Sequence, residues 1–170
     1  MRVFQTLQEV ADLVGQELAV SDWIEITQER INLFAQATGD HQWIHVDPLR
    51  ASQGPFGTPI AHGFLTLSLM PSFFDSALRV EQTRMAVNYG VNKVRFTSPV
   101  PVGSRLRARI VLKSAEPIEP RGFQMTYTVT VEREGADKPV CVAETIARRD
   151  RKSTRLNSSH SQQSRMPSSA

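Results

Sequence analysis

The 170-residue chain has a single cysteine, two tryptophans and two tyrosines, and it has no long uninterrupted apolar run. One cysteine cannot form an internal disulfide, which fits a reducing compartment, so we expect a cytoplasmic location. The most apolar stretch, residues 60–78, is interrupted by seven polar or proline residues and does not predict a membrane span. The start of the chain has acidic residues and lacks the continuous apolar segment of a signal peptide, so no secretory signal is expected.

The formal net charge of +3 arises entirely at the end of the chain. Four of the 20 basic residues and one of the 17 acidic residues fall in residues 150–170, which leaves 16 of each sign in residues 1–149. A neutral domain gives no electrostatic reason to expect a nucleic acid or an anionic membrane as a partner.

Residues 150–170 differ from the rest of the chain in composition. They are rich in serine, arginine and glutamine and show no periodicity. Back-translation of residues 150–160 and 164–170 gives strings that resemble a widely used sequencing adapter. We therefore predict one domain over residues 1–149 and a disordered tail of non-native origin, with a disordered natural terminus as the alternative.

Helices are predicted for the first half of the chain. Residues 6–16 carry apolar side chains at helical spacing, and a second helix is expected between Thr27, which can cap its start, and Gly39, which can end it. The polar loop that follows contains a helical turn at 48–52. Residues 59–78 are apolar on nearly every face, which predicts a buried helix.

The second half of the chain alternates in the manner of strands. Strands are predicted at 85–89, 93–96, 104–114, 123–132 and 140–148. The segment 123–132 is the clearest, with Met125, Tyr127, Val129 and Val131 on one side. Helices followed by antiparallel strands predict the α+β class, with a sheet wrapped around one buried helix.

The densest group of reactive side chains lies in residues 39–48, GDHQWIHVDP. Asp40 would follow the negative end of the second helix, which disfavours an ionised carboxylate and so favours a proton donor. His45 can act as a base near neutral pH, and a loop can bring the two side chains together. The alternative is that Asp40 and Asp47 are turn residues and that the histidines are surface groups.

A second group, PIAHGF at residues 59–64, opens the predicted buried helix. The first backbone N–H groups of a helix have no partner within it, and a glycine lets a ligand approach them closely. The N–H of Gly63 could therefore polarise a carbonyl oxygen. For His62 we expect a capping or packing role rather than a catalytic one.

Taken together, GDHQWIHVDP and the later IAHGFLTLSL resemble the MaoC-like, (R)-specific enoyl-CoA hydratase family, in its short nodulation-protein-N-like branch. The resemblance extends over residues 20–148. It implies a single hot-dog domain, a homodimer, and hydration of trans-2-enoyl-CoA thioesters to (3R)-3-hydroxyacyl-CoA thioesters. Gln42 and Trp43 stand where many members have Asn-Pro, which bears on the acyl-chain preference.

The resemblance also implies a role for each site residue. The family's catalytic aspartate and histidine fall on Asp40 and His45, and its oxyanion-hole glycine falls on Gly63. We expect His45 to activate the water and Asp40 to deliver the proton, although the motif leaves the division of the two protons open. The chemistry requires no metal and no redox cofactor. Gln42 and Arg95 are the candidate substrate-binding residues.

Two other functions stay open on the sequence. The hot-dog fold also hosts acyl-CoA thioesterases, and an accessory protein could bind an acyl thioester without converting it. Ser68 lacks the glycine-flanked turn of a serine nucleophile, and Cys141 is expected to be a small core residue. Turnover of an enoyl thioester would separate these functions.

Overall fold

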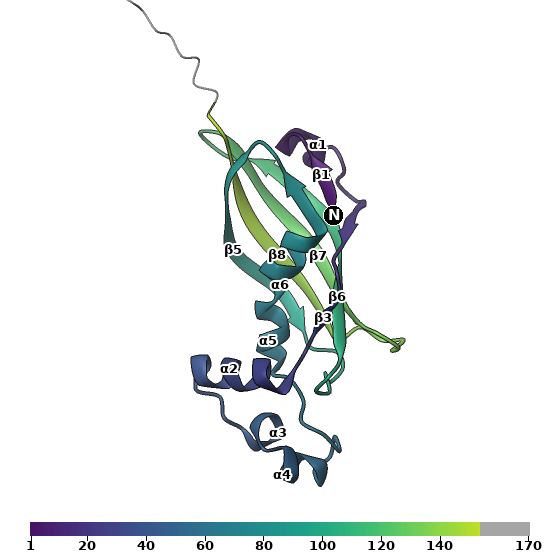
Figure 1. Cartoon of the computed structure of the whole chain (residues 1–170). Coiled ribbons are helices and arrows are strands. Elements are labelled where there is room, and N and C mark those ends of the chain that lie inside the picture. Colours follow the sequence, from purple (N-terminus) through teal and green to yellow (C-terminus); the bar gives the residue numbers. More distant parts are fainter. Residues whose placement is uncertain (154–170) are drawn as a thin grey trace, which may run out of the picture.

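The structure, a computed structural model, describes residues 1–153 (Figure 1). The helices are α1 (Leu7–Ala11), α2 (Gln28–Thr38), α3 (Trp43–Val46), α4 (Pro48–Ser52), α5 (Gly63–Ser68) and α6 (Met70–Ala77). The strands are β1 (Arg2–Phe4), β2 (Glu17–Val20), β3 (Ile24–Glu25), β4 (Leu78–Val80), β5 (Thr83–Arg95), β6 (Arg105–Pro117), β7 (Gly122–Arg133) and β8 (Cys141–Arg151). Among the described residues, none of the helices has the length and hydropathy of a membrane span.

One antiparallel sheet dominates the fold, with the strand order β2-β6-β7-β8-β5 and with β3 also paired to β6. β1 and β4 form a separate parallel pair. Figure 1 shows the long strands curving around α5 and α6, while α2, α3 and α4 gather at one end of the molecule. β5 is an edge strand, and within the described residues only β8 pairs with it.

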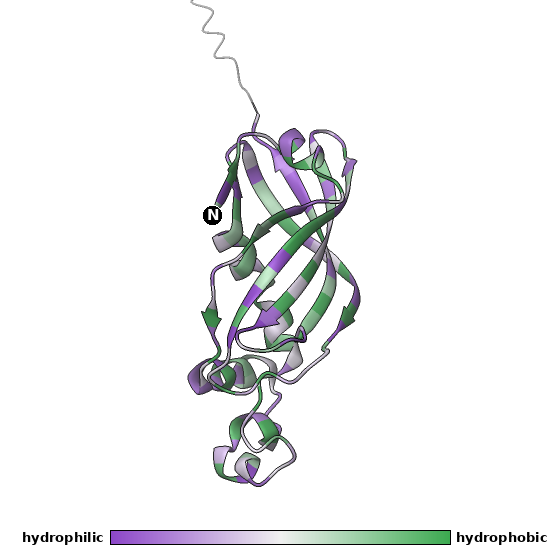
Figure 2. Cartoon of the chain, turned by 90° about the vertical axis from the view of Figure 1, so that its right-hand side faces the viewer, coloured by the Kyte–Doolittle hydropathy of each residue, from purple (hydrophilic) through white to green (hydrophobic). Residues whose placement is uncertain are grey.

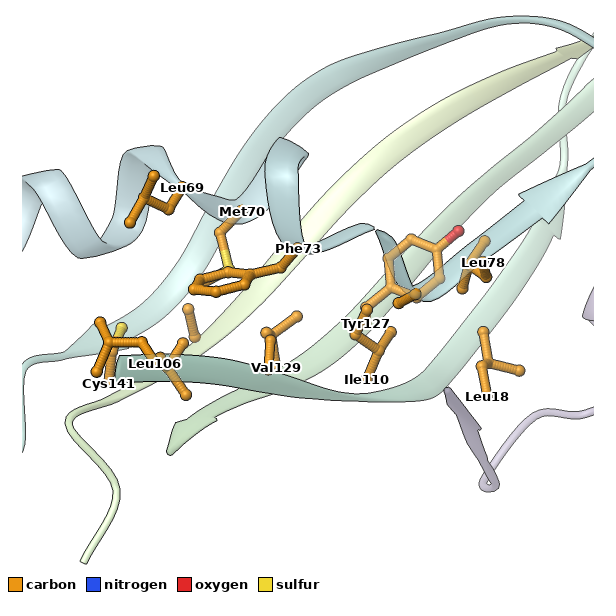
Figure 3. Packing of buried hydrophobic residues seen from close by; sticks show 14 of the residues in the cluster. Leu18, Leu69, Met70, Phe73, Leu78, Leu106, Ile110, Tyr127, Val129 and Cys141 are labelled. Carbon is orange, nitrogen blue, oxygen red and sulfur yellow. The ribbon is translucent and has the colours of Figure 1, made fainter. Parts of the chain in front are cut away.

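The core lies between α6 and the inner face of the sheet. Phe73 on α6 is completely buried, and Figure 3 shows it directed toward Val129 and the neighbouring strands. Phe74 packs edge-on against Tyr127 with the ring centroids 4.9 Å apart. Along the strands, hydrophobic and hydrophilic residues alternate (Figure 2), so that one face of the sheet contributes to this core.

The α+β class and the second predicted helix are confirmed. The hydroxyl of Thr27 accepts a hydrogen bond from the Arg30 N–H (3.2 Å) at the start of α2, and Gly39 ends the helix with φ +80°. α4 is the predicted helical turn. β7 buries the predicted alternating set, Met125, Tyr127, Val129 and Val131.

The prediction of one buried helix over 59–78 is wrong in its bounds and in its burial. Helix α5 begins only at Gly63, because the preceding chain is extended: the N–H of Ala61 donates to the Val100 carbonyl (2.8 Å). The helical segment divides at Leu69 into α5 and α6. The segment is not buried on every side, since the apolar side chain of Phe64 is 67% exposed.

The first helix is shorter than the predicted 6–16. Gly15, with φ +86°, turns the chain, and its N–H donates to the Leu112 carbonyl (2.7 Å), which leads into β2. The strands predicted at 85–89 and 93–96 are one continuous strand, β5. The sequence did not predict β1, β2, β3, β4 or α3.

The end of the domain also differs from the predicted boundary at residue 149. β8 continues through Arg151, because Asp150 pairs with Met85 and Arg151 with Thr83 across the β5–β8 ladder. The greater part of the predicted tail, residues 154–170, lies outside the described residues.

Candidate active site

Asp40 follows directly on the end of α2. The left-handed conformation of Gly39 lets its N–H close the last helical turn onto the Ala35 carbonyl (2.8 Å) and turns the chain toward α3. The Asp40 side chain is exposed, and its Oδ1 accepts a hydrogen bond from the Gln42 N–H (3.3 Å). The carboxyl group is thus held at the surface of the loop, where a ligand can reach it.

His45 is carried by α3 and is buried, with 7% of its surface exposed. Its Nδ1 lies 2.6 Å from the Ile60 carbonyl oxygen, which can only accept, so Nδ1 carries the proton and Nε2 keeps its lone pair. Burial lowers the pKa of His45 below its usual 6.5, and the hydrogen bond to the Ile60 carbonyl opposes this effect. His45 is therefore held as a neutral imidazole with a basic Nε2.

His62 immediately precedes α5 and contacts both Asp40 and His45. Its ring stacks on that of His45, with centroids 3.9 Å apart and an interplanar angle of 27°. Its Nε2–H donates to the backbone carbonyl of Asp40 (2.9 Å), while its buried Nδ1 has no partner among the described residues. His62 provides no cap hydrogen bond to α5, so it packs rather than caps, and it joins the loop of Asp40 to the ring of His45.

The three side chains form one cluster, with a nitrogen or carboxylate oxygen of each within 4.8 Å of the others. Such a cluster could be considered for a metal ion. The lone pairs of an imidazole lie in the plane of its ring, however, and those of two nearly parallel stacked rings do not converge on one point. The arrangement fits an acid and a base that share a small polar ligand better than it fits a chelated cation.

Gly63 is the first residue of α5, next to this cluster. A Cβ atom at this position would lie 2.5 Å from the ring of Phe96, so the ring occupies the space that any side chain would need. Phe96 in turn packs edge-on against Phe64, with centroids 5.5 Å apart. A side chain at this position would therefore require the ring of Phe96 to move.

The other residues singled out in the sequence lie in different settings. Gln42 is exposed beside Asp40 at the start of α3. Arg95 is exposed at the end of β5, where its guanidinium donates to the adjacent Val94 carbonyl (2.7 Å), and it is not part of the cluster. The Ser68 hydroxyl donates to the Phe64 carbonyl. Cys141 is a buried core residue, as predicted, and burial raises the pKa of its thiol to about 11.

A cavity of about 610 Å³ lies between α6 and the strands β5 and β8. Leu67 and Ser68 line its near end, one turn of helix beyond Gly63. The cavity does not include Asp40 or His45. The polar cluster and the cavity thus occupy successive stretches along the same helical segment.

The fold defines the class: a hot-dog α+β domain, with a cluster of one carboxylate and two histidines at the start of its central helix. A family described as MaoC-like domain matches residues 9–134, and the chain belongs to this hydratase and dehydratase family. The 3-hydroxyacyl-thioester dehydratase Z of Mycobacterium tuberculosis is 54% identical over 148 residues, which are 87% of this chain and 98% of that protein. Nodulation protein N of Rhizobium meliloti is 49% identical over 144 residues, 84% of this chain and 89% of that protein.

Solved structures agree on the fold. The (R)-hydratase from A. caviae involved in PHA biosynthesis superposes with a TM-score of 0.63 at 22% identity, over 79% of this chain and 94% of that one. A monoamine oxidase regulatory protein from Archaeoglobus gives a TM-score of 0.71 at 24% identity, over 89% of this chain and 97% of that one. At these identities the likeness concerns the hot-dog fold.

Sequence reasoning missed the placement of two residues. His62 was expected to pack or cap, and its contact with both Asp40 and His45 depends on three segments that meet only in the folded chain. Phe96 was not singled out, since its contact with Gly63 joins the end of β5 to the start of α5. For His62, the one available signal in the sequence was its position next to Gly63 in the segment AHG.

Proposed function

We propose that the protein is an (R)-specific enoyl-CoA hydratase, which adds water to a trans-2-enoyl-CoA to give the (3R)-3-hydroxyacyl-CoA. The observation that carries the proposal is the meeting of Asp40 and the free Nε2 of His45 beside the start of α5. The membership of the chain in a hydratase and dehydratase family supports it. Catalysis of the reverse reaction, loss of water, follows by microscopic reversibility.

We assign each residue a task in this reaction. A water molecule held between the Asp40 carboxyl and His45 Nε2 gives up a proton to Nε2 as its oxygen bonds to C3 of the enoyl thioester. Asp40 delivers a proton to C2, and the proton held by His45 then returns to Asp40, so that the sum is one water added. The thioester oxygen, which gains charge as the C2–C3 π bond breaks, accepts a hydrogen bond from the Gly63 N–H.

We assign His62 the task of holding Asp40 and His45 in place. It fixes the Asp40 backbone through Nε2 and covers one face of the His45 ring. Gln42 and Arg95 stay predictions as contacts of the substrate. A cytoplasmic location, which suits a CoA thioester substrate and a free buried thiol, also belongs to the proposal.

We further propose a homodimer that joins two copies of β5 edge to edge. β5 has 13 residues and is exposed along nearly its whole length. Met85, Val87, Tyr89 and Val91 on this strand are 46–55% exposed, an unusual concentration of apolar side chains for a free sheet edge. A second copy would pair the edge and cover these side chains. Light scattering at micromolar concentration should give twice the mass of the chain, and a monomer would contradict the dimer.

The test of function is turnover of trans-2-butenoyl-CoA by the purified protein. We expect the absorbance of the conjugated thioester to fall and the product to be the 3R alcohol, with no thiol released. Release of free CoA thiol with the double bond intact would instead identify a thioesterase. Binding without conversion, over several chain lengths, would identify an accessory protein, the possibility that the resemblance to nodulation protein N keeps open.

A further inference from the structure

The cavity beside α6 begins one helical turn beyond Gly63, and under the proposed function it would hold the acyl chain. Gly63, next to the proposed acid and base, and Phe74, which packs against Tyr127 in the cavity wall, lie eleven residues apart on the α5–α6 segment. At 1.5 Å per residue this corresponds to at most roughly 16 Å, since the segment divides at Leu69. An extended chain advances about 1.2 Å per bond, a third of the 3.6 Å that a residue spans, so the eleven bonds of a twelve-carbon acyl group extend about 13 Å, which leaves roughly 3 Å for a hydrogen bond at that end.

The walls of the cavity are apolar for much of this path, but the far end is not. Leu67, Met70 and Phe74 line it from the helical side. At the far end lies the hydroxyl of Tyr127, which accepts a hydrogen bond from Arg149 Nε (3.0 Å). The hydroxyls of Thr83 and Thr145, two further lining residues, are buried and have no partner among the described residues. Buried polar groups without partners call for a ligand group that can satisfy them.

Arg149 also lines the cavity, and no carboxylate within residues 1–153 forms a salt bridge with it. Asp150, its neighbour in sequence, pairs with Arg84 (3.8 Å), and Asp75, which also lines the cavity, is exposed on α6 and forms no salt bridge with it. The other lining arginine, Arg79, pairs with Glu81 (2.6 Å). Two of the arginines on the same sheet, Arg107 and Arg109, are paired with glutamates. A guanidinium is always charged and binds carboxylates through two parallel N–H groups.

We infer that the cavity selects acyl groups that carry a carboxylate at their far end, so that the substrate class is the mono-CoA thioester of a long trans-2-enedioic acid. The carboxylate binds the Nη groups of Arg149, beside the hydroxyl of Tyr127. The apolar wall accommodates the methylene chain between the carboxylate and the thioester. This inference rests on the proposed hydratase function for the position of the thioester.

Two substrates of equal length test it: trans-2-dodecenoyl-CoA and the mono-CoA thioester of trans-2-dodecenedioic acid, which differ only at the terminal carbon. The readout is the ratio of their kcat/KM values, because the fraction of folded protein cancels within one variant. The full chain should prefer the dioic substrate by about tenfold or more, as a site built around a polar group discriminates against an analogue that lacks it. Arg149→Met should bring the ratio close to one, and Arg149→Lys should keep part of the preference.

Arg148→Met is the matched control. Arg148 neighbours Arg149 on β8 but is exposed, stacks on the ring of Tyr89 (3.7 Å to the centroid) and does not line the cavity. Its variant should keep the ratio of the unaltered protein. A ratio near one in the unaltered protein, or a ratio that Arg149→Met leaves unchanged, overturns the inference while hydration of trans-2-dodecenoyl-CoA still upholds the proposed function.

If neither substrate is hydrated, the proposed function fails and the inference is tested by binding. Calorimetry with the saturated thioesters dodecanoyl-CoA and mono-dodecanedioyl-CoA needs no catalysis. A dissociation constant about tenfold lower for the dioic thioester, lost in Arg149→Met, supports the inference. Equal dissociation constants overturn it.

Discussion

The two ends of the α5–α6 segment lie in opposite surroundings. At the start of α5, one exposed carboxylate and two buried histidines meet on loops and short helices, and the contacts that hold them are hydrogen bonds to the carbonyls of Asp40 and Ile60. At α6, Phe73 and its neighbours are buried against the continuous strands of the sheet (Figure 3). The stability of the fold should therefore depend on the α6 end and the chemistry on the α5 end. Substitutions at the two ends should separate turnover from the free energy of unfolding.

The largest effect on turnover is expected at the polar end. Asp40→Asn and His45→Gln should each lower kcat by roughly 10²–10⁴-fold, the usual contribution of a positioned proton-transfer group. Both substitutions are close to isosteric, so the melting temperature should change little. Asp47→Asn and His41→Gln are matched controls, since Asp47 caps α4, where asparagine caps as well, and His41 is exposed. Loss of turnover in the controls to the same extent would contradict the assignment.

The largest effect on stability is expected at the other end. Phe73→Ala removes a completely buried ring and should lower the free energy of unfolding by about 3–5 kcal/mol. Denaturant titration measures this loss, and kcat per folded molecule should stay close to that of the unaltered protein. Phe56→Ala, at a residue that is 45% exposed, should change the free energy of unfolding by only about 0.5 kcal/mol. Equal losses in the free energy of unfolding for Phe73→Ala and Phe56→Ala would contradict the assignment of the core to the α6 end.

Gly63→Ala tests the junction between the two ends. The new Cβ would displace the ring of Phe96 or the first turn of α5, and a shift of about 1 Å in a positioned group can lower the rate by roughly 10²-fold. Steady-state kinetics should show this fall in kcat. In the double variant Gly63→Ala/Phe96→Ala the space is vacant, so part of the lost turnover should return. Absence of any recovery would argue against the packing explanation.

A smaller effect concerns pH. Because the pKa of His45 lies below 6.5 in the folded protein, its Nε2 stays basic at pH 6.5, and kcat/KM should begin to fall only at a lower pH. The unfolded chain binds this proton more readily, so the free energy of unfolding should decrease as the pH falls below about 6.5 and should recover above it. His45→Gln should reduce that decrease. A fall in kcat/KM that begins above pH 6.5 would contradict the lowered pKa.

The sequence predicted the parts of the molecule that depend on local pattern. The alternation of Met125 and Tyr127 in β7 and the caps of α2 are local signals, and the structure agrees with them. The bounds of α5 and the contacts of His62 depend on segments far apart in the chain, as when Val100 holds Ala61 extended. Tertiary contacts decide such features, and no local pattern encodes them. The motif predicted the residues of the candidate site, but only the fold shows that His62 contacts both Asp40 and His45.

The central claim, that the polar end adds water to an enoyl thioester, is tested most directly by the reaction in D₂O. The protein is incubated with trans-2-butenoyl-CoA, and the product is analysed by mass spectrometry and chiral chromatography. The account predicts an intact CoA thioester with a 3R hydroxyl group and one deuterium at C2, formed by the unaltered protein and far more slowly by Asp40→Asn and His45→Gln. Free CoA with an unlabelled butenoate, or substrate recovered unchanged, would contradict it.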